Sequence, residues 1–122
     1  MRYMKKIEPV KQGSNKDAIH NLQKGLLYLI IHQVRISANE REILTRRIAP
    51  EMATKTFGEA TADIVGLWQY RFKNWPNYMP ALPPKLKAKV QSLPIRRHRG
   101  TGEVDEMTAE ALNWLLKELG AL

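Results

Sequence analysis

Few side chains in this sequence have the types and spacing that catalysis or metal binding requires. His20, His32 and His98 are far apart, and the sequence contains no His-Glu-x-x-His pattern that would hold a metal. Cysteine is absent, which excludes disulfides, thiol catalysis and cysteine metal ligands. No serine lies in a Gly-x-Ser-x-Gly turn, and there is no Gly-x-x-x-x-Gly-Lys loop to cradle a phosphate. The sequence therefore predicts neither an enzyme nor a metal or cofactor site.

Two pairs of close carboxylates, Glu40 with Glu42 and Asp105 with Glu106, could in principle act as acid and base. Each pair stands at or near the start of a predicted helix, where the helix dipole stabilises negative charge. We therefore interpret these four residues as helix-start residues.

A different chemistry, the stacking of a sugar on aromatic rings, is suggested by residues near the end of one predicted helix. Aromatic rings offer flat apolar area, while amides and arginines can hydrogen-bond to hydroxyls and carboxylates. The residues predicted to form this ligand-binding surface are Gln69, Arg71, Asn74, Trp75 and Tyr78. Alternatively, Trp75 and Tyr78 fix a long loop onto the rest of the protein. An amide beside an apolar helix face, such as Gln23, is instead expected to bridge backbone groups between helices.

The net charge of +8 is concentrated in one segment. No acidic residue occurs between Ile64 and Gly102. The basic residues of that segment are Arg71, Lys73, Lys85, Lys87, Lys89, Arg96, Arg97 and Arg99. Such a localised excess fits an anionic partner, such as nucleic acid, a wall polymer or lipid headgroups, or else a solvated surface without a partner.

The chain of 122 residues is long enough for one domain with one hydrophobic core. All of its apolar runs are shorter than a membrane span, so we predict none. Residues 1–10 include basic side chains but neither an apolar segment nor a small-residue cleavage site, so no secretory signal peptide is predicted. The expected localisation stays open between the cytoplasm and export by a non-classical route.

Apolar residues recur at helical spacing in several segments, which predicts an all-α fold. Helices are expected at about residues 14–34, 38–48, 59–73 and 106–119, with one short helix after Pro84. Residues 1–13 are expected to form an arm or a short edge segment. Within the first helix, the apolar run 26–31 could alternatively be a buried strand, although the helical stripe before it argues against this.

Two further expectations concern the second and the short helix. Pro50 is expected to end the second helix, on which Ile43, Leu44 and Ile48 face inward. The segment 74–101 contains five prolines, which block long helices and central strands. The short helix within that segment is expected to bury Leu86, Val90 and Leu93.

The stretch 56–72 organises the chain, and the pattern that begins it returns in 102–112. The matched pairs, 47 residues apart, are Phe57 with Val104, Gly58 with Asp105, Glu59 with Glu106, Thr61 with Thr108, Ala62 with Ala109 and Asp63 with Glu110. Two copies predict two equivalent helix entries in one small domain.

Four motifs follow one another in an order that is typical of a known family. They are Leu22-Gln23 in the first helix, the helix entry Phe57–Thr61, the pair Trp68-Gln69 and the second entry Gly102–Thr108. With these motifs the chain resembles the peptidoglycan-binding-domain family of three-helix wall-binding modules. The resemblance implies one domain over residues 14–122, a small orthogonal bundle with three core helices and one or two short inserted helices. The insertions relative to the family are expected at about residues 35–55 and 74–101, and Thr54-Lys55-Thr56 replaces the usual aspartate-glycine.

The resemblance implies a non-catalytic module that binds peptidoglycan or another anionic wall polymer and tethers a larger protein. Such a module would have a shallow groove lined by Trp75, Tyr78 and amides. Residues 108–122 also resemble a version found near the front of large toxin-like proteins. The alternative is therefore a structural or protein-interaction module in an injection apparatus, which predicts an exposed apolar patch. A third possibility, nucleic-acid binding, predicts a continuous basic stripe, but the sequence contains no recognisable nucleic-acid motif.

Overall fold

Helices account for the regular structure of this chain, as its apolar periodicity predicts. The computed structural model describes residues 3–33, 35–75 and 82–122, and in these ranges it contains helices and two isolated bridges but no sheet. The helices are α1 (Lys16–His32), α2 (Ala38–Thr54), α3 (Glu59–Lys73), α4 (Pro84–Val90) and α5 (Glu106–Glu118). The predicted all-α bundle is confirmed, and residues 26–31 belong to a helix rather than a strand.

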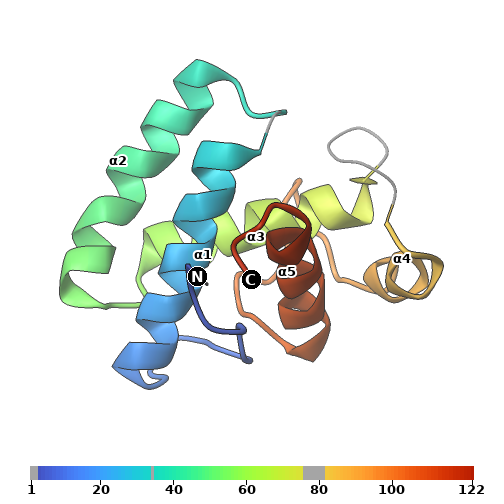
Figure 1. Cartoon of the computed structure of the whole chain (residues 1–122), viewed down its shortest axis with the longest axis horizontal. Helices are drawn as coiled ribbons and strands as arrows, with labels where there is room; N and C mark the ends of the chain where they lie inside the picture. The colour runs from blue at the N-terminus through green and yellow to red at the C-terminus, as the bar shows by residue number, and fades with distance from the viewer. Residues whose placement is uncertain (1–2, 34, 76–81) are drawn as a thin grey trace.

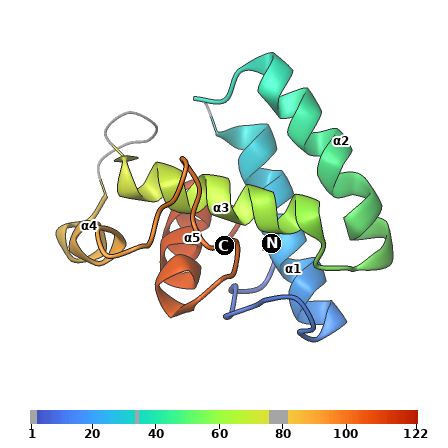
Figure 2. The same cartoon turned by 180° about the vertical axis from the view of Figure 1, so that it is seen from behind.

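The helices pack as a crossed bundle in which α3 lies across both α1 and α5 (Figures 1 and 2). Helix α2 packs along α1 on one side, and the short α4 packs against α3 and α5 on the other. The two ends of the chain lie close together, where the backbone N–H of Tyr3 donates to the carbonyl of Ala121 at 3.2 Å. None of the helices in the described ranges combines the length and apolar character needed to cross a membrane.

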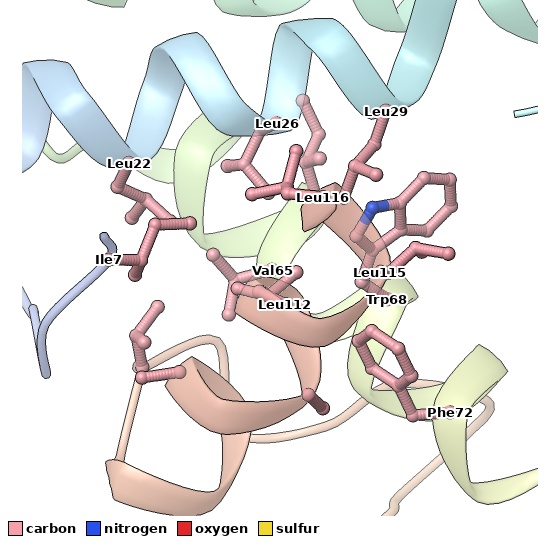
Figure 3. Packing of buried hydrophobic residues seen from close by; sticks show 14 of the residues in the cluster. Ile7, Leu22, Leu26, Leu29, Val65, Trp68, Phe72, Leu112, Leu115 and Leu116 are labelled. Atoms are coloured by element: carbon pink, nitrogen blue, oxygen red, sulfur yellow. The ribbon is translucent and has the colours of Figure 1, made fainter. Parts of the chain in front are cut away.

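The core lies where α1, α3 and α5 meet (Figure 3). Each of these helices contributes fully or almost fully buried apolar side chains. They are Leu22, Leu26 and Leu29 from α1, Val65, Trp68 and Phe72 from α3, and Leu112, Leu115 and Leu116 from α5. Burial of each such side chain favours folding by about 1.5–3 kcal/mol, so this intersection holds the bundle together.

The short helix α4 confirms its prediction. It begins with Pro84, whose fixed φ suits a first helical position. Leu86, Val90 and Leu93 are buried, as expected.

Helix α2 differs from its prediction in two ways. It continues through Pro50 to Thr54, so the expectation that Pro50 ends the helix was wrong. Ile43 is 49% exposed rather than facing inward, because the buried side of α2 is set by Leu44 and Ile48, one turn apart. The additional turn after Pro50 carries Glu51 to the start of α3, where its carboxylate makes several hydrogen bonds.

The N-terminal segment is packed onto the bundle rather than projecting as an arm. Met4, Ile7 and Val10 are buried. Asn21 of α1 and Asn113 of α5 each pair with the backbone of this segment. The Asn113 amide accepts from the N–H of Ile7 at 2.8 Å and donates to its carbonyl at 2.9 Å. These contacts come from residues far away in the chain, so the local sequence of the segment does not reveal its burial.

The two predicted helix entries are equivalent in three dimensions. The Gln23 side chain in α1 donates to the Thr56 carbonyl at 2.9 Å and to the Thr61 hydroxyl at 3.1 Å. The Gln69 side chain in α3 donates to the Glu103 carbonyl and to the Thr108 hydroxyl, both at 2.9 Å. Each buried glutamine thus holds the entry of the next core helix, an arrangement we call the glutamine clasp.

The start of α3 needs a carboxylate from another helix, because its N-cap residue, Gly58, has no side chain that could accept a hydrogen bond. Glu51 accepts from the backbone N–H groups of Gly58, Ala60 and Thr61 and from the Thr61 hydroxyl, at 2.7–3.0 Å. A Cβ on Gly58 would lie only 2.8 Å from that carboxyl group, so glycine is required for its approach. Partial burial raises the pKa of Glu51, but the hydrogen bonds from Thr61, Ala60 and Gly58 outweigh it and hold the pKa below its ordinary value.

Replacing Gln69 by leucine, which keeps the volume, should lower the free energy of unfolding by about 3 kcal/mol. The buried N–H of Gly102 would lose its partner, and the carbonyl of Glu103 would keep only the longer hydrogen bond from the Thr101 hydroxyl, at 3.4 Å. Gln23→Leu should cost about half as much, because the Gln23 amide oxygen already has no partner in the described residues. Urea unfolding followed by circular dichroism measures both. Equal losses would contradict the greater importance of the Gln69 clasp.

Replacing Glu51 by glutamine should destabilise the protein by about 1–2 kcal/mol at neutral pH, because a charged cap is lost. Since the pKa of Glu51 is lowered by folding, its contribution is complete above the ordinary pKa and disappears as the pH falls through the lowered value. The stability difference between wild type and Glu51→Gln should therefore shrink between about pH 5 and pH 3. Glu59→Gln, an exposed change in the first turn of α3, is the control for the loss of one carboxylate charge near the same helix entry.

Candidate functional site: a groove bordered by a basic turn

The structure describes four of the five residues predicted to bind a ligand, and these four do not form one surface. Gln69 is 1% exposed, and its amide is used in the clasp, where its oxygen also accepts from the N–H of Gly102 at 3.0 Å. The amide that was predicted to contact a ligand thus makes its hydrogen bonds within the protein. In the sequence, an amide on a helix looks the same whether it faces a ligand or the next helix.

Arg71 and Asn74 are also engaged within the protein. Arg71 is 6% exposed, pairs with Glu40 of α2 at 2.6 Å, and lies over the Trp68 ring with its guanidinium carbon 5.0 Å from the ring centre. The side-chain amide of Asn74 donates to the Tyr70 carbonyl at 3.0 Å and so helps to end α3. Arg71 nevertheless lines a hollow on the surface, whereas no described hollow includes Asn74.

Trp75 packs half-buried against the core, and Lys87 of α4 lies over its ring at 4.9 Å. This geometry matches the alternative interpretation, in which Trp75 fixes the long segment onto the bundle. Tyr78 lies outside the described residues. The predicted stacking surface is thus not assembled by the part of the chain that the structure describes.

A groove between α2 and α3 is the candidate functional site. It consists of two hollows, of about 450 and 250 Å³, which share Glu40 and Leu67 in their walls. We define the α2–α3 groove by the residues that line either hollow: Ser37, Asn39, Glu40, Ile43, Leu44, Arg47, Asp63, Leu67, Tyr70, Arg71, His98 and Arg99. Its walls combine apolar and aromatic side chains with arginines and carboxylates. This composition suits a ligand that has both apolar faces and charged groups.

Two groups of ion pairs line the groove. In the larger hollow, Asp63 of α3 pairs with Arg47 at 2.8 Å and with Arg99 at 2.7 Å, which leaves a net positive charge. Partial burial raises the pKa of Asp63, but hydrogen bonds and the charges of the two guanidiniums outweigh it and lower that pKa below its ordinary value. Glu40, which both hollows share, pairs with the buried Arg71. The Asp63 carboxylate thus orients two arginines beside the larger hollow.

A tight turn of four basic residues, Arg96–Arg99, borders this groove, and we call it the basic turn. The N–H of Arg96 donates to the Arg99 carbonyl at 2.7 Å, and the N–H of Arg99 donates back at 3.1 Å. The central residues Arg97 and His98 have φ values of 53° and 66°, the left-handed region that a two-residue hairpin turn requires. Glycine or asparagine usually occupies such positions, and another residue there costs about 1 kcal/mol.

The basic turn is held rigidly against α3. The N–H of Gly100 donates to the carbonyl of Gly66 at 2.9 Å, and the His98 ring meets Tyr70 edge to face at 5.2 Å. A Cβ on Gly100 would collide with the side chain of Gln69, so only glycine permits this close approach. The segment that leads from α4 into the turn runs along α3 (Figure 2). The glutamine clasp therefore also determines where the basic turn sits.

A larger hollow, of about 560 Å³, lies between the N-terminal segment and α1. Its charged walls are formed mainly by Lys5, Lys6 and Lys24. Lys24 lies over the Tyr3 ring at 5.2 Å, but no carboxylate holds the other two lysines in place within the described residues. The α2–α3 groove, whose arginines are held by carboxylates, is the better-organised site.

Comparison of the chain with protein-family models, with curated proteins and with solved structures gives no match.

Sequence reasoning missed most of the groove. Tyr70, His98 and Arg99 are near the predicted residues in the chain, but the tight turn that brings the last two to α3 contains neither glycine nor asparagine. Ile43 was assigned to the core, although its exposed position makes it part of the groove wall. The absence of acidic residues between positions 64 and 102 was the one signal that pointed toward the basic turn.

Replacing Arg97 by glycine should raise the free energy of unfolding by about 1 kcal/mol, because the strain of its left-handed backbone is removed. Arg96→Gly removes the same charge where φ is not positive, and it should lower stability by about 0.5–1 kcal/mol. Thermal or urea unfolding distinguishes them. A destabilising Arg97→Gly would show that the turn is not strained in solution.

Proposed function

We propose that this chain is a non-catalytic module that binds a glycan–peptide polymer of the cell wall along the α2–α3 groove. The observation that carries the proposal is the composition of the groove. Ile43, Leu67 and Tyr70 offer apolar area to sugar rings and methyl groups, and Arg47 and Arg99 offer donors to carboxylates. Peptidoglycan presents both kinds of group along one chain.

The glutamine clasps add support for the resemblance to peptidoglycan-binding modules. The motif residues that carry the resemblance, Gln23 with Thr61 and Gln69 with Thr108, form matching contacts between successive core helices. Motifs that occur by chance would have no reason to share one structural role. The matching contacts support a related architecture, and the composition of the groove supports the assignment of the ligand.

The assembly role in an injection apparatus has less support. It predicts a contiguous exposed apolar patch. Among the described residues, the large apolar side chains that are exposed are Tyr3, Ile31 and Ile43, which come from three different elements. One of them belongs to the groove that we assign to the wall polymer.

The proposal predicts that the protein sediments with purified insoluble peptidoglycan at about 0.15 M salt, where long-range attraction between exposed charges is largely screened. Ile43→Gln should weaken this binding about five- to tenfold, because roughly 1 kcal/mol of apolar contact is lost. Ile31→Gln is the matched control, since Ile31 on α1 is 47% exposed and lies outside the groove. Both positions are exposed, so neither change should unfold the protein.

Two results would contradict the proposal. One is the absence of wild-type sedimentation at this salt concentration, and the other is equal binding by Ile43→Gln and Ile31→Gln. Trp75→Ala tests the earlier alternative, because Trp75 packs against Lys87 outside the groove. If Trp75→Ala alone abolished binding, the ligand would instead be held by the long segment after α3.

A further inference from the structure

We infer that the basic turn binds the phosphate groups of a phosphodiester-linked wall polymer. The inference rests on the proposed function and extends it, because it names a second anionic component that the module would recognise beside the groove. Arg96 and Arg97 are exposed, and neither guanidinium has a partner among the described residues. Arg99 is 55% exposed and keeps donors available beyond its bond to Asp63.

The backbone of the turn points to a function for these side chains. Arg97 and His98 both occupy the left-handed region, where asparagine and glycine would be relaxed. Strained residues of this kind persist where the surrounding structure holds them, and they gather at binding sites. The contacts of Gly100 with Gly66 and of His98 with Tyr70 provide that support. The cations are thus displayed on a rigid frame, which lowers the entropy lost when a ligand binds.

The chemistry of the side chains favours phosphate. A guanidinium presents a planar fork of donors that matches a phosphate in a bidentate contact. A single carboxylate at an exposed arginine adds little affinity, whereas a chain of closely spaced phosphates can engage several cations of the turn together. His98 and Arg99 also line the groove, so a polymer bound there passes directly beside the turn.

Nucleic acid is a phosphodiester too, but the rest of the basic segment is not arranged to follow it. Lys73 donates to the Leu93 carbonyl at 2.9 Å, Lys89 pairs with Glu110 at 2.9 Å, and Lys87 covers Trp75. The expected continuous basic stripe is therefore not formed by the described residues.

The test compares wild type with the double variant R97N/H98G and with K85Q. Asparagine and glycine are the residues that such a turn prefers, so R97N/H98G should keep the backbone while removing one guanidinium and the imidazole. K85Q removes the same formal charge from an exposed position on α4. Circular dichroism and the thermal midpoint establish that each variant is folded, and R97N alone repeats the test with the Tyr70–His98 contact retained.

Binding is measured at about 0.15 M salt to cell walls that carry phosphodiester polymers, to the same walls after hydrofluoric acid has removed them, and to duplex DNA. We expect wild type and K85Q to bind the untreated walls at least tenfold more tightly than the stripped walls, and DNA more weakly than the untreated walls. R97N should bind stripped walls as tightly as wild type does and should bind untreated walls about fivefold more weakly than wild type, because Arg96 and Arg99 remain. R97N/H98G also removes a side chain that lines the groove, so its ratio of affinities for the two wall preparations is compared rather than its absolute affinity. That ratio should fall by at least as much as for R97N.

The inference is overturned if wild type does not distinguish the two wall preparations, if R97N and R97N/H98G keep the wild-type ratio of affinities for them, or if DNA binds as tightly as untreated walls. Binding to stripped walls reports on the groove separately. If wild type binds stripped walls and does not prefer untreated walls, the proposed function is retained and the inference about the basic turn is contradicted. If wild type binds untreated walls through the turn but does not bind stripped walls, the inference is retained and the proposed function of the groove is contradicted.

Discussion

The buried amide of Gln69 fixes the path of the chain between the basic turn and α5. It lies on α3 and makes contacts at the entry of α5, with the Glu103 carbonyl, the Thr108 hydroxyl and the N–H of Gly102. A polar group removed from water is tolerated only when its hydrogen bonds are made inside the protein. The segment before α5 must therefore follow one path, and Gly100, pressed against the same side chain, begins that path.

The position of the basic turn follows from this constraint. Once residues 100–103 are fixed on Gln69, the chain from α4 can reach them only by reversing direction beside α3. The reversal takes place in four residues, which forces Arg97 and His98 into left-handed conformations. The unfavourable backbone energy is offset by the ion pair of Arg99 with Asp63 and by the ring contact of His98 with Tyr70. The buried hydrogen bonds of Gln69 thus also hold the strained basic turn in its position at the surface.

Much of the fold could be predicted from the sequence because its signals are local and periodic. The apolar stripes of the helices, the cap at Asp105 and the short helix after Pro84 depend on neighbouring residues. The repeat at an offset of 47 residues predicted the equivalence of the two helix entries, and Gln23 was expected to bridge backbone groups between helices, whereas Gln69 was expected to contact a ligand. Pro50 was misjudged because its local preference to end a helix was overridden by contacts that the extra turn makes far away, through Glu51. Burial of the N-terminal segment depends on contacts with α1 and α5, such as those of Asn113, which lie far away in the chain.

The candidate site was harder to predict because it is formed by a segment that appeared to be peripheral. Helix α2, in the region expected to be an insertion, is joined to the bundle at both ends and in the middle. In the first turn of α2, Arg41 donates to the Ile30 carbonyl at the end of α1 at 2.9 Å and Glu40 pairs with Arg71. In the middle of α2, Arg47 pairs with Asp63 at 2.8 Å, and near its end Glu51 caps α3.

These attachments hold α2 at a fixed distance from α3, and the groove is the space that remains between them. A bundle with only the three core helices would have no such groove, since one whole wall would be missing. If the groove is the binding site, its specificity resides in α2 and in the basic turn, the two segments in which this chain departs from the compact pattern of its repeat. The core motifs then explain why the protein folds, and the two added segments explain what it can bind.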